Sequence, residues 1–170
     1  MVFKANEPAP PAEISLRPAT AADSEFLIQA YTTTRQDEMA SWGWNSAQQA
    51  AFVRMQFDAR RRGYMAQYPD AQICVICVGE SPAGSIIISR GQDEIRLVDI
   101  TVLPEFRNRG TGGHLIGGLI DEASRAGRAL RLTVLQNNRA KRLYERVGFV
   151  AKGGGEMYCE MEWAAAKRED

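Results

Sequence analysis

The most informative stretch of this sequence runs from Val98 to Gly113 and reads VDITVLPEFRNRGTGG. Its first half is an apolar strand pattern that ends at Pro104, and its second half is a basic, glycine-rich turn that leads into helical spacing. A helix start leaves several backbone N–H groups without partners, and its dipole favours an anion there. Glycines let the backbone approach that anion closely. The segment therefore predicts a phosphate-binding site between a strand and a helix.

Two common phosphate-binding motifs do not fit this segment. A P-loop requires G-x-x-x-x-G-K, and the lysine is absent, whereas a dinucleotide-binding G-x-G-x-x-G requires a glycine where Leu115 stands. The pattern that remains is R-x-x-G-x-G after a strand ending in V-x-P, formed by Arg107, Gly110 and Gly112.

Strand and helix patterns alternate around this segment in an order that predicts one mixed α/β domain. Strand patterns occupy residues 14–17, 73–78, 84–89, 95–102, 130–135, 149–151 and 157–163. Helical spacing begins near residues 20, 45, 115 and 140. Short links through residues 79–83 and 91–93 favour antiparallel neighbours. On the second helix, Phe52, Met55 and Ala59 are expected to face inward, with residues 60–62 at its C-terminal end.

Length and composition exclude several classes of protein. The chain has 170 residues, 45% of them hydrophobic and 25% charged, which is typical of a single globular domain. Lys plus Arg and Asp plus Glu both number 21, so the basic excess of a nucleic-acid-binding protein is missing. Apolar runs fall short of the ~20 residues that span a membrane. We expect a flexible segment at residues 1–13, a domain at 14–164 and a tail at 165–170.

The cysteines and the N-terminus favour a cytoplasmic location. Three cysteines do not form a disulfide framework, and residues 1–13 lack the apolar core of a signal peptide. Cys74 and Cys77 lie in a strand pattern, where residues three apart point to opposite faces. The sequence therefore predicts no metal site.

Two segments together resemble the GNAT superfamily of acetyl-CoA-dependent N-acetyltransferases. The motif of Arg107, Gly110 and Gly112 is similar to the superfamily's pyrophosphate-binding motif, and NNRAKRLYERVGF at residues 137–149 is similar to its N-x-x-A-x-x-L-Y-x-x-x-G-F segment. The order of elements from Ile14 to Trp163 also agrees. The resemblance implies an α/β (α+β) fold of one GNAT-like domain, with a mixed, mostly antiparallel sheet flanked by helices.

The resemblance implies that an amine directly attacks the thioester of acetyl-CoA, a co-substrate, without a metal. It further implies that the strand at residues 100–102 separates from its neighbour, typically through a bulge, and that its backbone binds the pantetheine arm. Arg109, Lys141 or Arg142 would form ionic contacts with the phosphates. The implied cofactor-binding residues are Ile100, Thr101, Val102, Arg107, Asn108, Arg109, Gly110, Thr111, Gly112, Gly113, Asn137, Ala140 and Tyr144.

Asp99 is the candidate general base, because it interrupts the apolar strand that delivers the cofactor-binding backbone. An ammonium with a pKa of about 10.4 must lose its proton before it attacks. The alternative is that Asp99 is held by backbone donors or a nearby arginine. Glu38 is a second candidate or a solvated helix residue. His114 is expected to face solvent or pack, not to act as the base.

Tyr144 matches the position at which the resemblance implies a general acid that protonates the leaving thiolate. The alternative is that Tyr144 only packs beside Leu143. The resemblance likewise implies that Asn137 bonds the pantetheine, or else caps the following helix.

The acceptor is expected to contact residues 35–44 and 153–158, by the same resemblance. The sequence allows a small-molecule amine or a protein amino group, and a homodimer or a monomer. The aromatic residues nearby either form a wall for the acceptor or anchor a loop; they are Trp42, Trp44, Tyr64 and Tyr158. The alternative function is a non-catalytic acyl-CoA-binding sensor or interaction module.

Overall fold

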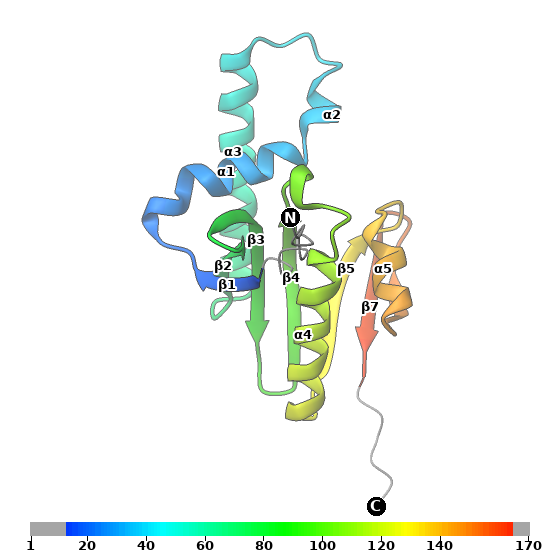
Figure 1. Cartoon of the computed structure of the whole chain (residues 1–170). Helices are drawn as coiled ribbons and strands as arrows, with labels where there is room; N and C mark the ends of the chain where they lie inside the picture. Colours follow the sequence, from blue (N-terminus) through cyan, green and yellow to red (C-terminus); the bar gives the residue numbers. More distant parts are fainter. Residues whose placement is uncertain (1–12, 165–170) are drawn as a thin grey trace, which may run out of the picture.

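The computed structural model describes residues 13–164 of the protein, with a seven-stranded sheet at the centre (Figure 1). The strands are β1 Ile14–Pro18, β2 Gln72–Val78, β3 Ser81–Arg90, β4 Glu94–Val102, β5 Ala129–Leu135, β6 Val150–Gly154 and β7 Tyr158–Trp163. The helices are α1 Ser24–Thr33, α2 Gln36–Met39, α3 Ser46–Gln67, α4 Thr111–Ala126 and α5 Ala140–Arg146, with 3-10 turns η1 Ala21–Asp23 and η2 Pro104–Phe106. Residues 1–12 and 165–170, which hold most of the predicted N-terminal segment and the whole predicted tail, lie outside the described residues.

The strands lie in the order β1-β2-β3-β4-β5-β7-β6, and all neighbours are antiparallel except β4 and β5. The predicted antiparallel links from β2 to β3 and from β3 to β4 are confirmed. Parallel strands need a long crossover, and α4 supplies it between β4 and β5. The predicted mixed, mostly antiparallel sheet is therefore present.

Most predicted helix ends are confirmed by their capping contacts. Asn45 Oδ1 accepts a hydrogen bond from Gln48 N at 2.9 Å and begins α3. Gly127 follows α4 with a φ of 63°, the left-handed conformation that commonly ends helices. The short helix α2 was not predicted, because four residues are too few to show helical spacing.

The inner face of α3 differs from the prediction. Met55 is 60% exposed and Ala59 is also exposed, whereas the half-buried Phe52 faces inward as expected. The helix continues to Gln67, so residues 60–62 lie before its last turn. The prediction was wrong because apolar residues occur on more than one face of this helix, and the spacing alone did not select one. The residues on α3 that are buried or line a cavity are Val53, Phe57, Arg60, Arg61 and Tyr64.

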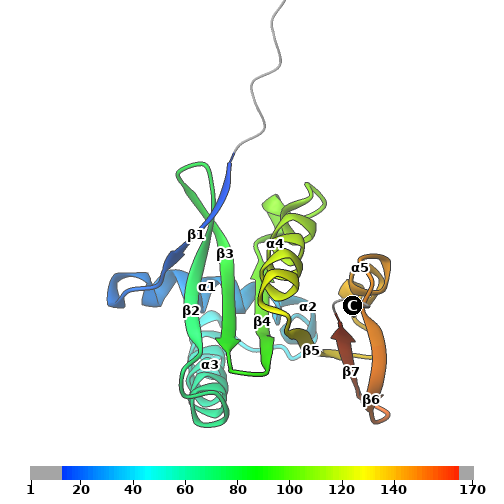
Figure 2. The ribbon, with the colours of Figure 1, turned by 90° about the horizontal axis from the view of Figure 1, so that it is seen from below.

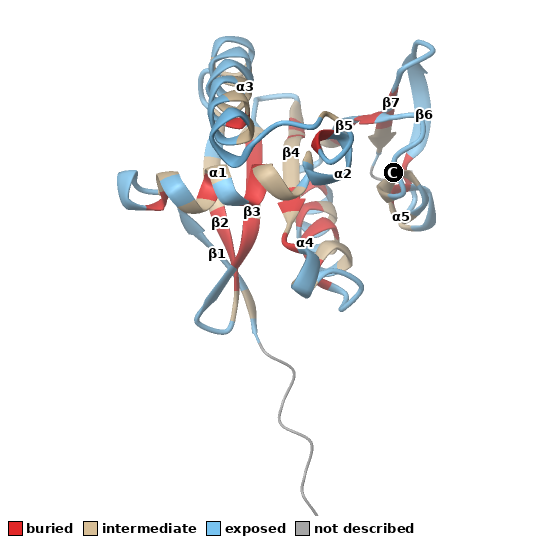
Figure 3. Cartoon of the chain, turned by 90° about the horizontal axis from the view of Figure 1, so that it is seen from above, coloured by how far each residue is buried: buried red, intermediate tan, exposed pale blue. Residues whose placement is uncertain are grey.

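Helices cover both faces of the sheet. Figures 2 and 3 show α4 and α5 on one face and α3 on the other, together with α1. The main core lies under α4, where Leu115, Ile116 and Leu119 pack against buried strand residues. A smaller cluster around Tyr31 and Val53 joins α1, α2 and α3. The burial of apolar surface on both faces therefore fixes the central strands, which carry the site residues.

The parallel pair β4 and β5 is joined over only part of its length. Residues 94–97 of β4 pair with residues 129–132 of β5, and the pairing stops there. At this point β4 also has a bulge, since Ile88 pairs with Leu97 and Ile87 with Asp99, which leaves Val98 as the extra residue. Beyond the bulge β5 leans away from β4 (Figure 1). The two strands therefore separate at residues 98–102, as the resemblance implied, and this separation of β4 from β5 is called the cleft.

Within residues 13–164, no helix has the length and apolar character needed to cross a membrane.

Candidate active site

The predicted phosphate-binding segment is a tight turn that leads into α4. Gly110 has a φ of 84° at the N-cap, a conformation that favours glycine. The first hydrogen bond of the helix runs from His114 N to Gly110 O at 2.9 Å. The N–H groups of Thr111, Gly112 and Gly113 therefore precede the helical ladder. Together with the dipole of a 16-residue helix they offer hydrogen-bond donors and a positive potential to an anion.

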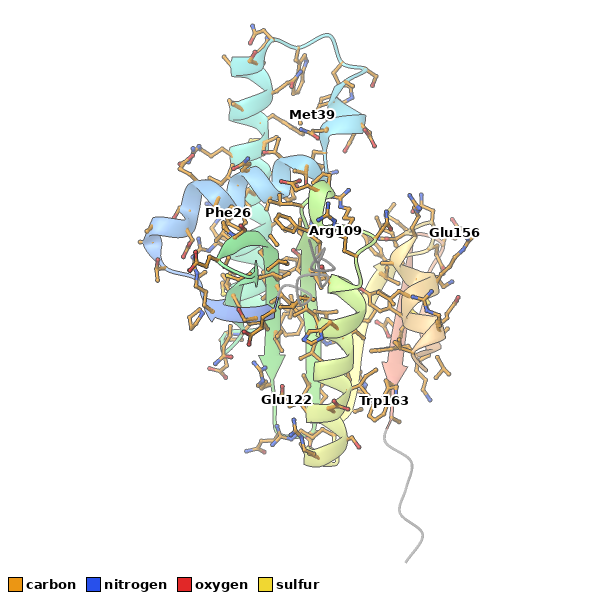
Figure 4. All side chains as sticks on the ribbon, viewed as in Figure 1. Phe26, Met39, Arg109, Glu122, Glu156 and Trp163 are labelled. Carbon is orange, nitrogen blue, oxygen red and sulfur yellow. The ribbon has the colours of Figure 1, made fainter. Side chains whose placement is uncertain are left out.

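The side chain of Arg107 is bound by the protein itself. Its Nε donates to Val102 O at 2.7 Å, and its Nη2 donates to Thr33 Oγ1 at 3.4 Å. Arg107 thus ties the turn to the end of β4 and to α1, which leaves the backbone of the turn to face an anion. Arg109 lies at the turn above the start of α4 (Figure 4), is exposed, and forms no ion pair with another described residue.

The end of β4 presents its backbone to the cleft. Thr101 is 8% exposed, and on the opposite edge of β4 it pairs with Ser85 of β3. A side chain at Gly84 would overlap the carbonyl oxygen of Thr101, so glycine is required for this close approach of β3 to β4. Beyond Leu97 the edge of β4 that faces β5 has no strand partner. Within residues 100–102, Val102 O already accepts from Arg107 Nε and Ile100 N already donates to Asp99, so only the remaining N–H and C=O groups on that edge are available to an extended ligand.

Tyr144 of α5 is buried in the main core. Its ring is 5% exposed and lies 5.7 Å from the ring of Phe149. Burial raises the pKa of Tyr144 to about 12, and the negative charge of Asp99 adds to the rise. No buried side-chain oxygen or nitrogen within residues 13–164 lacks a hydrogen bond, and none is recorded for the Tyr144 hydroxyl, so this hydroxyl reaches solvent. Tyr144 is therefore a protonated group in the main core whose hydroxyl touches solvent.

Asp99 forms an ion pair that the sequence did not identify. Its Oδ1 accepts a hydrogen bond from Arg60 Nη2 of α3 at 2.7 Å. Burial raises the pKa of Asp99, while the charge of Arg60 and a hydrogen bond from Ile100 N lower it. The side chain of Asp99 is 22% exposed. The alternative that a backbone donor and a nearby arginine hold Asp99 is therefore confirmed, and its role as the general base stays a prediction.

A cavity of about 40 Å³ lies between the sheet and the helices α1 and α3, next to this ion pair. Its walls are mostly aromatic and aliphatic, and its charged residues are Arg60, Arg61 and Asp99. Asp99 and Thr101 line the cavity and also belong to the strand that borders the cleft. The cavity and the cleft therefore meet at β4. The remaining lining residues are Leu27, Tyr31, Phe57, Tyr64, Ile73, Ser85 and Ile87.

Other predicted residues lie apart from this junction or have a different partner. Glu38 pairs with Arg35 at 2.7 Å, is half exposed, and does not line the cavity. His114 is exposed, as expected. Ala140 N donates to Asn138 Oδ1 at 2.9 Å in the turn before α5, whose N-cap is Arg139, and Asn137 is exposed.

Two of the aromatic residues anchor a loop. The rings of Trp42 and Trp44 lie 4.8 Å apart, and each lies 5.2 Å from the ring of Phe52. Tyr64 alone among the four predicted aromatic residues lines the cavity, whereas Tyr158 is 49% exposed on β7.

A sequence model of the acetyltransferase (GNAT) family matches residues 31–149, which include the cleft, α4 and Tyr144. The chain belongs to this family. The resemblance inferred from its two motifs is thereby confirmed. No curated protein matches the sequence closely enough to name an acceptor.

Solved structures of GNAT proteins share the fold at low sequence identity. PaiA N-acetyltransferase from Thermoplasma acidophilum, solved with coenzyme A, is 16% identical, with a TM-score of 0.66 over 89% of this chain and 99% of that chain. A GCN5-related N-acetyltransferase from Rhodopseudomonas palustris is 20% identical, with a TM-score of 0.62 over 93% and 99%. YncA from Salmonella typhimurium, solved with acetyl-CoA, is 20% identical, with a TM-score of 0.58 over 92% and 96%. These likenesses confirm the GNAT fold.

Sequence reasoning missed Arg60 and Tyr31 at the cavity. The two are 29 residues apart on different helices, so no local pattern joins them. The only local signal was the spacing of Arg60 and Tyr64, which puts both on one face of α3.

Proposed function

We propose that this protein transfers the acetyl group of acetyl-CoA to the amine of a small molecule or of a protein. The observation that carries the proposal is the junction at β4. One edge of this strand is open to the cleft that leads to the anion-binding start of α4, and its Asp99 side chain borders the cavity on the other side. A thioester in the cleft and an amine from the cavity would meet at this strand.

The cleft suits acetyl-CoA in length and chemistry. The amides of Thr111, Gly112 and Gly113 would hold the pyrophosphate, with Asn108 and Gly110 shaping the turn. The open backbone of residues 100–102 would bond the pantetheine arm, and one of its N–H groups would polarise the thioester carbonyl. The exposed Asn137 and the adjacent Ala140 border the other side, with Arg109 or Arg142 available to the remaining phosphate. Lys141 donates to Gln136 Oε1 at 3.0 Å, which makes it the less available cation.

Asp99 would accept the proton of the acceptor amine, directly or through water. Its raised pKa makes it a stronger base than an exposed aspartate, and the pairing with Arg60 keeps it ionised. The nitrogen then forms a bond to the carbonyl carbon and releases its second proton to water, and the carbon–sulfur bond breaks. Tyr144 would donate its proton to the departing sulfur and regain one from solvent. Its high pKa keeps the hydroxyl protonated, which is the state that a proton donor needs.

Isothermal titration with acetyl-CoA tests the first half of the proposal. We expect saturable one-to-one binding, and weaker binding of dephospho-CoA by the contribution of one charged contact. Dephospho-CoA keeps the pyrophosphate but lacks the terminal phosphate. The comparison therefore separates the contribution of the helix amides to binding from that of an arginine at the terminal phosphate. Absence of binding by the folded protein would overturn the proposed function.

A screen of amines tests the second half by following the release of free CoA thiol. The panel should pair small metabolite amines with amino acids, polyamines and peptide N-termini. Release of CoA with one class would identify the acceptor. Tight acetyl-CoA binding without release by any class would instead support the alternative of a non-catalytic acyl-CoA sensor.

A further inference from the structure

Arg60 is held more firmly than the other cations around the cavity. Its Nη2 donates to Asp99 Oδ1 at 2.7 Å, and its Nε donates to the Tyr64 hydroxyl at 2.7 Å. Its guanidinium carbon lies 5.6 Å from the ring centre of Tyr31 and 5.2 Å from that of Tyr64. Two hydrogen bonds and two rings restrict a side chain that is otherwise rich in rotamers. A guanidinium held in this way presents a fixed charge to Asp99.

We propose that Arg60 is a positioning residue, which keeps the Asp99 carboxylate ionised and oriented toward the acceptor amine. This inference rests on the proposed function, in which Asp99 takes the proton of that amine. Arg60 does not itself need to touch the acceptor.

Asp99 needs such a partner because it is partly removed from water. Its side chain is 22% exposed, and burial disfavours the charged form of a carboxyl group. A protonated Asp99 could not accept a proton from the amine. The ion pair offsets this desolvation and lets the carboxylate exist at the edge of an apolar cavity.

The contact also leaves room for the reaction. Among the described residues, one N–H of Arg60 reaches Oδ1, so the pair is not bidentate, and the carboxylate keeps free lone pairs. Tyr64 accepts the Nε hydrogen bond and so prevents the guanidinium from turning its other edge toward Asp99. The contact with Arg60 therefore orients the Asp99 carboxylate and leaves some of its lone pairs free to accept a proton.

The other ionisable groups near Asp99 do not supply this role. From α3 they are Arg61 and Tyr64, from α1 Tyr31, and from α5 Tyr144. The tyrosines are neutral donors, and Arg61 lines the cavity without an ion pair to another described residue. Arg60 is the cation in direct contact with Asp99.

The test measures the pKa of Asp99 itself in the full chain, by NMR of its side-chain carboxyl carbon, assigned with Asp99→Asn. The variants are Arg60→Met, Arg60→Gln and Arg60→Lys. We expect the two uncharged variants to raise the pKa of Asp99 by about one to three units, and the lysine variant to restore most of the difference. An unchanged pKa in both uncharged variants would overturn the proposal. The spectra also report whether each variant is folded.

Arg54→Met is the matched control, because Arg54 lies on the same helix and pairs with Glu25 of α1 at 2.9 Å. We expect it to leave the pKa of Asp99 unchanged. A shift as large as that of Arg60→Met would mean that any lost arginine on α3 disturbs Asp99, which contradicts a specific role.

Turnover of the amine found in the screen connects the contact to the reaction. The acid limb of kcat/KM should move upward with the NMR pKa in Arg60→Met, while the Kd of acetyl-CoA stays constant by calorimetry. A pKa that moves without the acid limb would overturn the positioning role, because the reaction would not use that carboxylate. Loss of acetyl-CoA binding by the wild-type protein is a separate result, and it would overturn the proposed function instead.

Discussion

The cleft and the cavity on the two sides of β4 are built in different ways. The cleft is formed mainly by backbone, with the turn and helix start at residues 103–113 following directly on the strand. The cavity is formed by side chains, and its ion pair joins Arg60 to a residue 39 positions away. Amide donors tolerate many side-chain changes as long as the backbone is kept, whereas a side-chain pair depends on both residues. We therefore expect the two sides to respond differently to substitution.

Gly112→Asp should have the largest effect and should act on the cleft. A carboxylate at the helix start repels the pyrophosphate, and the added Cβ lies 3.4 Å from Leu143 Cδ2, so α5 must also adjust. Loss of about three charge-assisted hydrogen bonds, at roughly 1.5 kcal/mol each, predicts an increase of about 1000-fold in the Kd of acetyl-CoA. Calorimetry measures it.

Gly118→Asp is the control for that charge. It lies on the same helix, is exposed, and a Cβ there meets no atom within 4 Å. We expect a near-normal Kd. Retained acetyl-CoA affinity in Gly112→Asp would mean that the phosphate site lies elsewhere.

Tyr144→Phe should lower kcat by about 100-fold or more, the contribution of one general acid, with little change in acetyl-CoA affinity. Because the pKa of Tyr144 is raised to about 12, the wild type should show no alkaline loss of rate from this group well below pH 12. Tyr68→Phe, at the end of α3, serves as the control. Normal turnover of Tyr144→Phe would exclude this residue as the acid.

Asp99→Asn should lower kcat by about 100-fold, since an amide cannot accept the proton. In the wild type, burial raises the pKa of Asp99, so the acid limb of kcat/KM should lie above the range of an exposed aspartate. As pH falls through this limb, Asp99 gains a proton and the rate declines. Glu38→Gln tests the second candidate base. A large loss of kcat in Glu38→Gln, together with normal kcat in Asp99→Asn, would make Glu38 the base instead of Asp99.

Tyr64→Phe should have the smallest effect, because it removes one hydrogen bond to Arg60 and keeps the ring. The donor of this bond is a charged guanidinium, but the bond is exposed to solvent, so we expect its loss to cost about 0.5–1.5 kcal/mol, which corresponds to a decrease of roughly 2- to 10-fold in kcat/KM. Acetyl-CoA affinity should not change. A loss as large as that of Asp99→Asn would show that the Tyr64 hydroxyl has a role of its own in the reaction.

The folding pattern was largely readable from residue types at particular positions. Asn45, Gly127 and the alternating apolar residues of β5 mark helix ends and a strand through local chemistry. The inner face of α3 could not be predicted, because the apolar Met55 is exposed and the charged Arg60 lines the cavity. Arg60 is 41% exposed and turns toward the cavity because Asp99 and the ring of Tyr31 bind it there, and those two partners come from other elements.

The sequence by itself determined the proposed cofactor side of this protein. The conformation of Gly110 and the free amides of α4 depend on residues within a few positions of one another, so a short segment of sequence fixes their arrangement. Only the tertiary structure decided the proposed acceptor side. Which cation meets Asp99, and which rings enclose it, depends on how α1 and α3 pack on the sheet, and that packing is the sum of many weak contacts between distant residues.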